Sequence, residues 1–240
     1  MAHRLLDASH ELRDATSKLR FGPPVAYVYR PLDYAAALSD GYVTRFGRGK
    51  KDVVFVGMNP GPFGMAQTGV PFGEVSFVRD WMKLDGAVLA PTKTHPKRPV
   101  LGLQCTRSEV SGRRLWGAFA ATFPRAEDFF ERAYVLNFCP LLFLGESGVN
   151  LTPDKLAKSE RARVEAVCED HLKKALAILA PKHAVGVGGY ATKCLERLGI
   201  ENVQIATMPH PSPASPTANR GWDAAAKLAL EKAGIRGLIR

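Results

Sequence analysis

Residues 53–65 have the sequence VVFVGMNPGPFGM, and this segment decides the fold. Its first four residues are apolar and β-branched or aromatic, which is typical of a short strand buried on both faces. Similar short apolar runs recur along the chain at 134–136, 184–187 and 203–207. Because helical patterns separate the four runs, they predict an α/β fold with a parallel sheet that helices cover on both faces.

The N-terminal region is predicted to be a helix that belongs to the same domain. Apolar residues recur at helical spacing from Leu5 to Leu19, and Gly22-Pro23-Pro24 ends the pattern. The chain contains no internal repeat and no linker-like segment. We therefore expect one domain over 1–240, in which 1–24 form the N-terminal helix and its Gly-Pro-Pro break.

Three further helices are predicted in the C-terminal half. The longest begins at Thr152-Pro153, where an N-cap residue precedes a proline in the first turn, and it ends before Pro181. One stripe of its surface is apolar, and it consists of Val164, Cys168, Leu172, Leu176 and Leu179. Shorter helices are predicted at 190–198 and 222–233, each followed by a glycine.

The composition is that of a globular protein with an excess of positive charge. Hydrophobic residues make up 46% of the 240 residues, enough for a core, which excludes a disordered chain. The formal net charge is +10. Half of it falls in 82–116, where seven basic residues face only Asp85 and Glu109. Such a block suits a polyanion such as DNA, although a merely solvated basic surface explains it equally well.

The location and the assembly state are predicted from what the sequence lacks. No run of about 18 apolar residues could span a membrane, and residues 1–20 resemble no secretory or transit signal. We therefore expect an intracellular protein, in the cytoplasm or nucleoid of a bacterium or the nucleus of a eukaryote. We expect no membrane partner and a monomer.

No sequence pattern calls for a metal or another cofactor. The four cysteines are far apart and form no CxxC pair, so they are interpreted as small buried hydrophobic residues: Cys105, Cys139, Cys168 and Cys194. HExxH, GxSxG and paired histidine ligands are missing. The glycines of 186–189 lack the dinucleotide-binding fingerprint and are interpreted as sites of close helix–sheet packing.

Polar residues follow the predicted strands at the point where each strand ends. Asn59 follows the first run, Asn137 the second and His210 the fourth. Because the carboxyl ends of parallel strands meet at one edge of a sheet, where ligands bind, we expect these three residues to converge.

Each of these side chains suits one part of the chemistry of a nucleobase. Asn59 can position a water through its carbonyl but cannot act as a general base, and His210, between two prolines, can stabilise a developing anion. The amide of Asn137 matches N3–H and O4 of uracil and mismatches cytosine. Phe72 can stack on a base. Taken singly, each also has an ordinary explanation as a turn cap, a structural histidine, a buried hydrogen-bonded amide or a core aromatic residue.

Four segments together resemble a known family, and they are 57–74, 108–116, 137–143 and 210–222. They are similar to the motifs of the single-strand-selective monofunctional uracil-DNA glycosylases, and the resemblance covers most of the chain after about Tyr27. It implies the uracil-DNA glycosylase fold, a three-layer α/β/α sandwich with a central, mainly parallel four-stranded sheet. It also implies hydrolysis of the N-glycosidic bond of uracil, and of 5-hydroxymethyluracil or other damaged bases, in single- and double-stranded DNA.

The resemblance assigns roles to individual residues. Asn59 would position the attacking water and His210 would stabilise the leaving base, with no metal and no lysine nucleophile. Base contacts would come from Met58, Gly61, Met65, Phe72 and Asn137. Residues of the segment 211–221 would enter the duplex as a wedge, and those expected to contact DNA are Pro211, Ser212, Pro213, Ala214, Asn219, Arg220 and Gly221. Members of the family often carry arginine where this chain has Ala214, so we expect a weaker grip on duplex DNA.

Further expectations are weaker or open. The loop 147–159, with Ser147, Asn150 and Lys155, suits a DNA phosphate at a helix N-terminus, although an ordinary capped helix explains it equally well. The range of damaged bases, including xanthine, is open. A non-catalytic nucleic-acid binder and an α/β enzyme that binds mononucleotides through its glycine loops are the competing interpretations.

Overall fold

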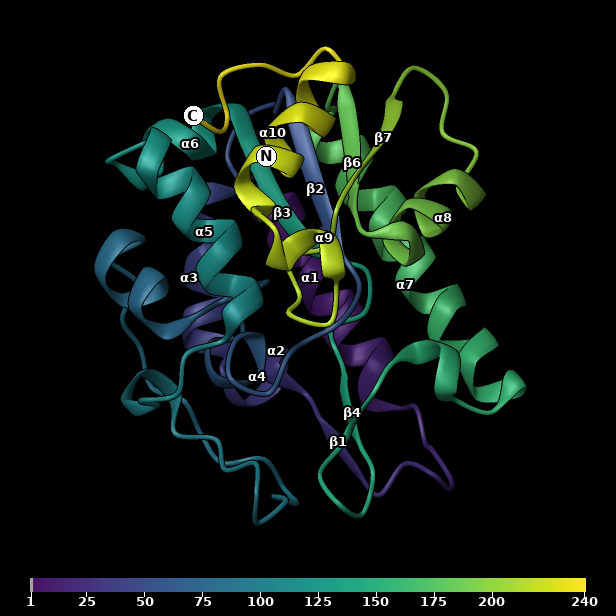
Figure 1. The fold of residues 1–240 in the computed structure, drawn as a ribbon. Coiled ribbons are helices and arrows are strands. Elements are labelled where there is room, and N and C mark those ends of the chain that lie inside the picture. Colours follow the sequence, from purple (N-terminus) through teal and green to yellow (C-terminus); the bar gives the residue numbers. More distant parts are fainter. Residues whose placement is uncertain (1) are drawn as a thin grey trace.

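Four parallel strands form the central sheet of the computed structural model, which describes residues 2–240 (Figure 1). They are β2 (Val53–Gly57), β3 (Ala133–Asn137), β6 (His183–Val187) and β7 (Gln204–Met208), and their order across the sheet is β3-β2-β6-β7. Each corresponds to one of the four predicted runs, the last shifted by one residue. The prediction of a parallel sheet in an α/β fold is confirmed.

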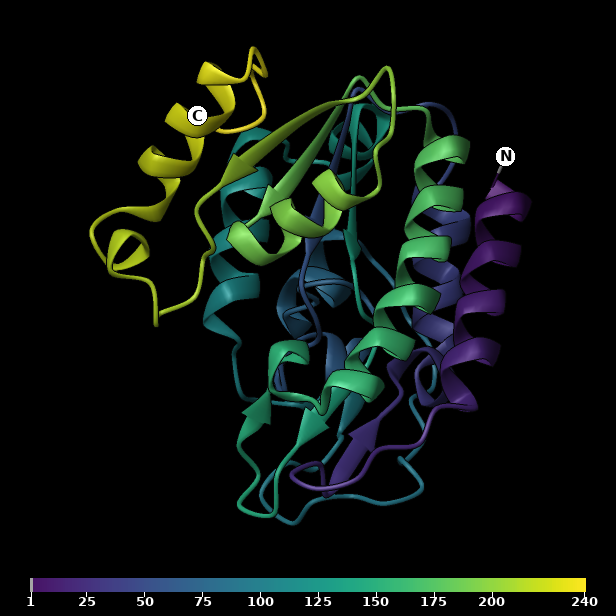
Figure 2. The same ribbon diagram turned by 90° about the vertical axis from the view of Figure 1, so that its right-hand side faces the viewer.

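Helices cover the sheet on both faces, as predicted (Figure 2). On one side lie α1 (Ala2–Ser17), α3 (Ala36–Phe46) and α7 (Lys158–Leu179), and on the other side lie α5 (Val110–Thr122) and α10 (Trp222–Lys232). Shorter elements fill the connections: α2 (Pro31–Tyr34), α4 (Met65–Thr68), η1 (Phe77–Trp81), η2 (Gly102–Gln104), α6 (Ala126–Arg132), α8 (Gly189–Arg197) and α9 (Pro216–Asn219). The predicted apolar stripe of α7 is buried along its whole length.

The start predicted for the long helix is wrong. Thr152 precedes only a single 3₁₀ turn, η3 (Pro153–Lys155), and α7 begins at Lys158. Leu156 and Ala157 have ψ values of 154° and 142°, so extended backbone separates the turn from the helix. The first-turn proline serves the short turn, whereas the side chain of Thr152 makes no capping hydrogen bond to it. The helix N-terminus that was expected to face a DNA phosphate is therefore absent at Thr152.

A second, antiparallel sheet lies beyond the carboxyl edge of the first. It consists of β1 (Tyr27–Tyr29), β4 (Leu142–Leu144) and β5 (Asn150–Leu151) in the order β1-β4-β5. Strands of two or three residues leave almost no periodicity, which is why the sequence did not predict them. The β4–β5 hairpin places Asn150 next to the loop after β2, where Asn150 Nδ2 lies 3.5 Å from the carbonyl oxygen of Pro60.

Apart from the short turn η2, the basic segment 82–116 is irregular until α5 begins at Val110, and the β4–β5 hairpin anchors it. His95 is buried, and its Nδ1 accepts the backbone N–H of Lys97 at 3.0 Å. Its Nε2–H is then free to donate to the carbonyl of Glu146 at 2.9 Å. Arg98 Nε donates to the carbonyl of Gly148 at 3.0 Å. The segment is thus fastened by polar contacts to a defined place beside the sheet.

Other predictions concern packing. All four cysteines are buried and free. A Cβ atom on Gly186 would lie 2.6 Å from the Cα of Thr192, so this glycine lets α8 approach β6, as interpreted from the sequence.

No helix within 2–240 has the length and apolar character needed to cross a membrane. The single domain over 1–240 stays a prediction, and Met1 lies outside the described residues.

The α1–α7 contact contains a histidine that makes the fold sensitive to acid. The Nδ1–H of the buried His171 donates to the carbonyl of Ala8 at 3.1 Å, and burial lowers the pKa of His171 to about 4. The unfolded chain, with a pKa near 6.5, therefore binds a proton that the folded chain rejects. The free energy of unfolding is therefore unaffected by His171 above pH 6.5 and decreases as the pH falls toward 4. At pH 5 the decrease is roughly 2 kcal/mol.

We predict that His171→Asn flattens this dependence, because asparagine offers a donor at the same place and does not titrate. Urea unfolding between pH 7 and pH 5 measures it, with His3→Asn on the exposed face of α1 as the control. An equally steep loss of stability in His171→Asn and in the wild type would contradict the assignment.

Candidate active site

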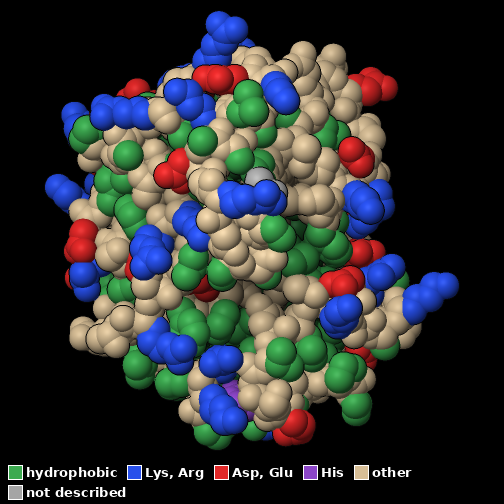
Figure 3. Space-filling view, viewed as in Figure 1, with side chains coloured by type: hydrophobic (Ala, Val, Ile, Leu, Met, Phe, Trp, Pro, Cys, Tyr) green, Lys and Arg blue, Asp and Glu red, His purple; other side chains and the backbone are tan. Residues whose placement is uncertain are grey.

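The structure brings Asn59, Asn137 and His210 together in one cavity of about 470 Å³ at the carboxyl edge of the sheet. Phe72 lines the same cavity. The space-filling view shows a hollow below α9, with Lys and Arg side chains above and below it (Figure 3). Three residues remote in sequence therefore share one space of a size suited to a small planar ligand.

Strand register explains the convergence. Gly57, the last residue of β2, is paired with Asn137, the last residue of β3. The ladder continues past both strand ends, because the backbone N–H groups of Phe138 and Cys139 donate to the carbonyls of Gly57 and Met58, each at 2.9 Å. Asn137 is thereby held beside the loop that carries Asn59. His210 arrives from β7, two strands away.

Gly57 is the point of closest packing beneath the site. A Cβ atom here would overlap Oδ1 of Asn137 and would lie 2.5 Å from Cε2 of Phe72. Phe72 itself has a φ of 52°, in the left-handed region that a phenylalanine rarely adopts, so the fold holds its ring in place against a backbone preference. The centres of the Phe72 and His210 rings are 6.0 Å apart.

Two amide atoms in the cavity wall are buried without a hydrogen-bond partner among the described residues. They are Nδ2 of Asn59 and Oδ1 of Asn137. The other amide atom of Asn137, Nδ2, donates to the sulfur of Met65 at 3.2 Å, which leaves Oδ1 as the acceptor. An unpaired buried polar atom costs about 1–3 kcal/mol, so this pair indicates a ligand that supplies the missing partners.

His210 is held as a neutral ring with one free donor. Its Nδ1 accepts the backbone N–H of Ser212 at 3.1 Å, so the proton of the neutral ring is on Nε2. Burial lowers the pKa of His210 below its ordinary value, which keeps the ring uncharged at neutral pH. His210 can therefore donate one hydrogen bond from Nε2.

The loop 59–64 is fixed by side chains from its surroundings. Nε2 of Gln67 donates to the carbonyl of Pro62 at 2.9 Å, and Oε2 of Glu109 accepts the N–H of Phe63 at 3.3 Å. Removal from water raises the pKa of the Glu109 carboxyl to about 7, and the bonds from the loop oppose that rise. The sequence analysis counted Glu109 only as one charge in the basic segment, although it lies in one of the motifs that carried the resemblance.

The other predicted base and phosphate contacts are divided between the cavity and its surroundings. Met58 and Gly61 line the cavity, and Asn150 does so from the β4–β5 hairpin. Met65 is buried behind Asn137 and does not line it. Ser147 and Lys155 are exposed outside the cavity.

The rim of the cavity contains a cation that the sequence did not single out. Arg107 lies with its guanidinium 3.9 Å from the centre of the Phe63 ring, and Arg98 approaches the same ring to 5.5 Å. Arg107 lines the cavity, so positive charge stands at its mouth. The sequence signal for it was the excess of basic residues in 82–116, which does not say which of them faces the site.

The segment 211–221 contains α9 and borders the cavity, which Ser212 and Pro213 line, and hydrogen bonds brace it. Nη1 of Arg114 donates to the carbonyl of Pro211 at 2.9 Å, and its Nη2 donates to Oδ1 of Asn219 at 3.1 Å. Nδ2 of Asn219 donates to the carbonyl of Pro213 at 2.7 Å. Pro211 is buried and Ser212 is partly buried, and the exposed residues include Pro213, Ala214, Arg220 and Gly221. The side chain of Asn219 is thus engaged within the segment.

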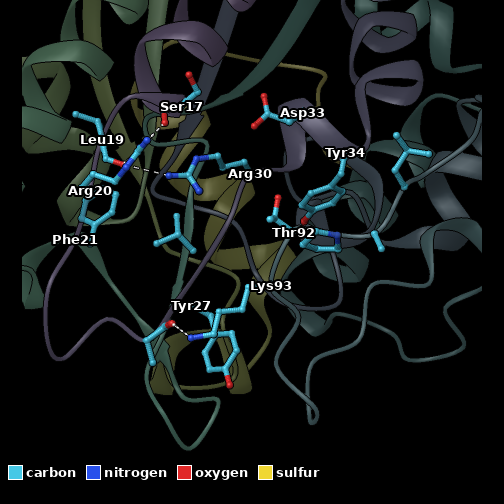
Figure 4. A pocket seen from close by; sticks show the side chains of 15 residues that line it. Ser17, Leu19, Arg20, Phe21, Tyr27, Arg30, Asp33, Tyr34, Thr92 and Lys93 are labelled. Carbon is cyan, nitrogen blue, oxygen red and sulfur yellow. Dashed lines mark hydrogen bonds between the residues drawn. The ribbon is translucent and has the colours of Figure 1, made fainter.

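A larger cavity, of about 670 Å³, lies elsewhere and contains none of the predicted site residues (Figure 4). Basic side chains face it, and they are already bonded to nearby carbonyls: Arg20 Nη1 donates to Ser17 at 2.7 Å, and Lys93 Nζ donates to Ala26 at 3.2 Å. Size alone therefore does not identify the site.

The same chain matches known proteins over its full length. The sequence model of the uracil DNA glycosylase superfamily matches residues 44–231. The chain belongs to the uracil-DNA glycosylase superfamily. Membership identifies a hydrolase that acts on the N-glycosidic bonds of DNA.

Individual relatives and a solved structure agree with this membership. The chain is 46% identical to the proteins of Rattus norvegicus and Bos taurus named single-strand selective monofunctional uracil-DNA glycosylase, over all of this chain and 87% and 89% of theirs. The fold is similar to that of SMUG2 of Pedobacter heparinus, with a TM-score of 0.63, 16% identity and 94% of each chain covered. The predicted uracil-DNA glycosylase fold is confirmed.

We predict that Gly57→Ala lowers the rate of uracil excision by about 100-fold, because the added methyl group displaces Asn137 and Phe72. The matched control is Gly189→Ala at the first residue of α8, where an added Cβ meets nothing within 4 Å. Single-turnover excision and thermal unfolding of both variants check it. Unchanged excision by Gly57→Ala would show that the close packing does not matter for the site.

Proposed function

We propose that this uracil-DNA glycosylase excises uracil from single- and double-stranded DNA through Asn59, His210 and Asn137, and that it initiates base excision repair. The observation that supports the proposal is the pair of unpartnered amide atoms beside the free Nε2–H of His210 in one cavity. Neither competing interpretation accounts for it. A binder that uses only surface charge needs no such cavity, and a mononucleotide enzyme that holds a phosphate at the glycines of 186–189 needs no pair of unpartnered amide atoms from Asn59 and Asn137.

The base has to leave the helix stack to reach these atoms. A stacked nucleotide is inaccessible to the cavity, so it must be rotated out at a cost of a few kcal/mol. Phe72 would stack on the extruded ring, and Oδ1 of Asn137 would accept its N3–H. Cytosine has no hydrogen at N3, so it would leave Oδ1 facing a second acceptor.

Bond cleavage places negative charge on the base. The bond between N1 and C1′ breaks, its electron pair stays on uracil, and C1′ becomes an oxocarbenium-like centre. The Nε2–H of His210 would donate to O2 and stabilise that charge. Asn59 would direct a water to C1′, and as the new C–O bond forms the water loses a proton to solvent or to the leaving base. An abasic site and free uracil result.

The strand should stay intact during this reaction. Cleavage of the strand by a glycosylase requires an amine that attacks C1′, and no lysine is among the residues that line the cavity. Base release should therefore be detected as a break only after hot alkali. Asn59 is not a base, so we also propose slower chemistry than in a site with aspartate at this position.

Gly61 in the cavity wall would influence the range of bases, and the segment 211–221 would influence the preference for single- or double-stranded DNA. Gly61 lines the cavity and would shape it near C5, where 5-hydroxymethyluracil carries its extra group. The segment 211–221 would act as the wedge, and its arginine-free tip at Ala214 would fill the vacated space poorly, so paired DNA gains little over single strands. A DNA substrate places the protein in the nucleus or the nucleoid.

Replacement of the two proposed catalytic residues tests the mechanism directly. We predict that Asn59→Ala and His210→Ala each lower single-turnover excision of uracil by about 10²- to 10³-fold and leave DNA affinity within about twofold. A uracil oligonucleotide treated with protein and then hot alkali measures excision, and a binding titration measures affinity. Absence of alkali-sensitive breaks with the wild type would refute the proposed function, and full turnover by either variant would refute that residue's role.

The wedge makes a separate prediction. We predict that Ala214→Arg raises the ratio of duplex to single-strand excision by about three- to tenfold, because a longer side chain can occupy the space of the flipped base. Ala224→Arg, exposed on α10, controls for the added charge. Excision from matched single- and double-stranded oligonucleotides gives the ratio. An equal rise in both variants would attribute the effect to charge alone.

A further inference from the structure

Glu109 lies where the loop 59–64 meets the N-terminus of α5, and no role follows for it from the chemistry above. It is the residue before the first residue of α5, yet its side chain does not cap that helix. The carboxyl instead turns to the loop. Oε2 accepts the N–H of Phe63 at 3.3 Å, and the N–H of Gly64 also bonds to the carboxyl.

The glycines of the loop are shaped around this carboxyl. A Cβ atom on Gly61 would overlap it, and one on Gly64 would lie 2.7 Å from Oε1. Neither glycine has a positive φ, so close approach, and not backbone conformation, is what each one provides. The two glycines after Asn59 thus form a cradle for one carboxyl group.

We propose that Glu109 is a positioning residue whose ionised carboxylate holds the Asn59 loop in the geometry that directs water to the sugar. The inference rests on the proposed role of Asn59. Nδ2 of Asn59 has no partner among the described residues, so its side chain depends on the backbone of the loop for its place.

The protonation state of Glu109 matters because its two partners in the loop are both donors. An ionised carboxylate can accept both N–H groups, whereas a protonated one presents an O–H to one of them and loses that bond. The pKa of about 7 puts the change near neutral pH. The titratable and charged groups around it are Glu74, whose charge raises the pKa further, and Arg107 and His210 on the cavity wall.

The variant Glu109→Gln distinguishes the ionised from the protonated form of the Glu109 side chain. Glu109→Gln keeps one acceptor and places an NH₂ group where the second acceptor was, so it imitates the protonated side chain at every pH. We expect the maximal single-turnover rate of this variant to be about tenfold lower than that of the wild type at pH 8 and only about twofold lower at pH 6. DNA affinity should not change. Glu231→Gln, exposed on α10, is the control.

The pH profile is the readout that a merely structural role would not move. Between pH 6 and pH 8 the wild-type rate should rise about fivefold, as expected for a group half ionised near pH 7, and Glu109→Gln should lack this rise. A variant with the wild-type profile, or with the wild-type rate at pH 8, would overturn the proposal.

An experiment without catalysis separates this inference from the proposed function. In the wild-type protein the amide signals of Phe63 and Gly64 should shift together in a ¹H–¹⁵N titration with a midpoint near pH 7. Signals that stay constant from pH 6 to pH 8 would overturn the inference even if uracil is excised. Because the titration uses only the wild-type protein and no substrate, it tests the role of Glu109 even if Glu109→Gln does not fold or the wild type does not excise uracil.

Discussion

The site depends on a glycine, Gly57, at the point where the parallel strands β2 and β3 end side by side. Gly57 is paired with Asn137, and no larger residue could stand there without displacing the amide and the ring of Phe72. The glycine therefore lets the amide of Asn137 and the ring of Phe72 pack directly against the backbone of β2. The other residues proposed to recognise a base come from loops that side chains of neighbouring elements hold in place.

The cavity groups that would face the base are two amides and an imidazole, and burial keeps the imidazole uncharged. Burial lowers the pKa of His210, and its Nδ1 is already occupied by the N–H of Ser212. A charged imidazolium would stabilise a uracil anion more strongly, but at neutral pH it would first have to be formed in a place that disfavours charge. A neutral donor that is already oriented avoids that cost, and orientation is what the fold supplies.

The sequence predicted the parts of the site that follow from strand ends and missed those that irregular backbone supplies. Asn59, Asn137 and His210 could be placed together because parallel strands end at one edge. Glu109 and Arg107 lie in a segment without periodicity, whose path depends on contacts such as that between His95 and Glu146. The same limit explains the error at Thr152, where the proline that follows was a correct signal for a turn of three residues and could not reveal how long the helix would be.

The positive charge of Arg107 lies at the rim of the cavity, apart from the uncharged groups proposed to act on the base. Arg107 is held at the rim against the ring of Phe63, while the atoms that face the proposed base are amides and a neutral imidazole. Cations inside the cavity would attract the phosphates of DNA and compete with the base for the same space. Cations at the rim would attract the DNA backbone to the mouth and would leave the interior to select by hydrogen bonds. Affinity would then respond to salt, whereas the choice of base would not, because it depends on short contacts that salt does not screen.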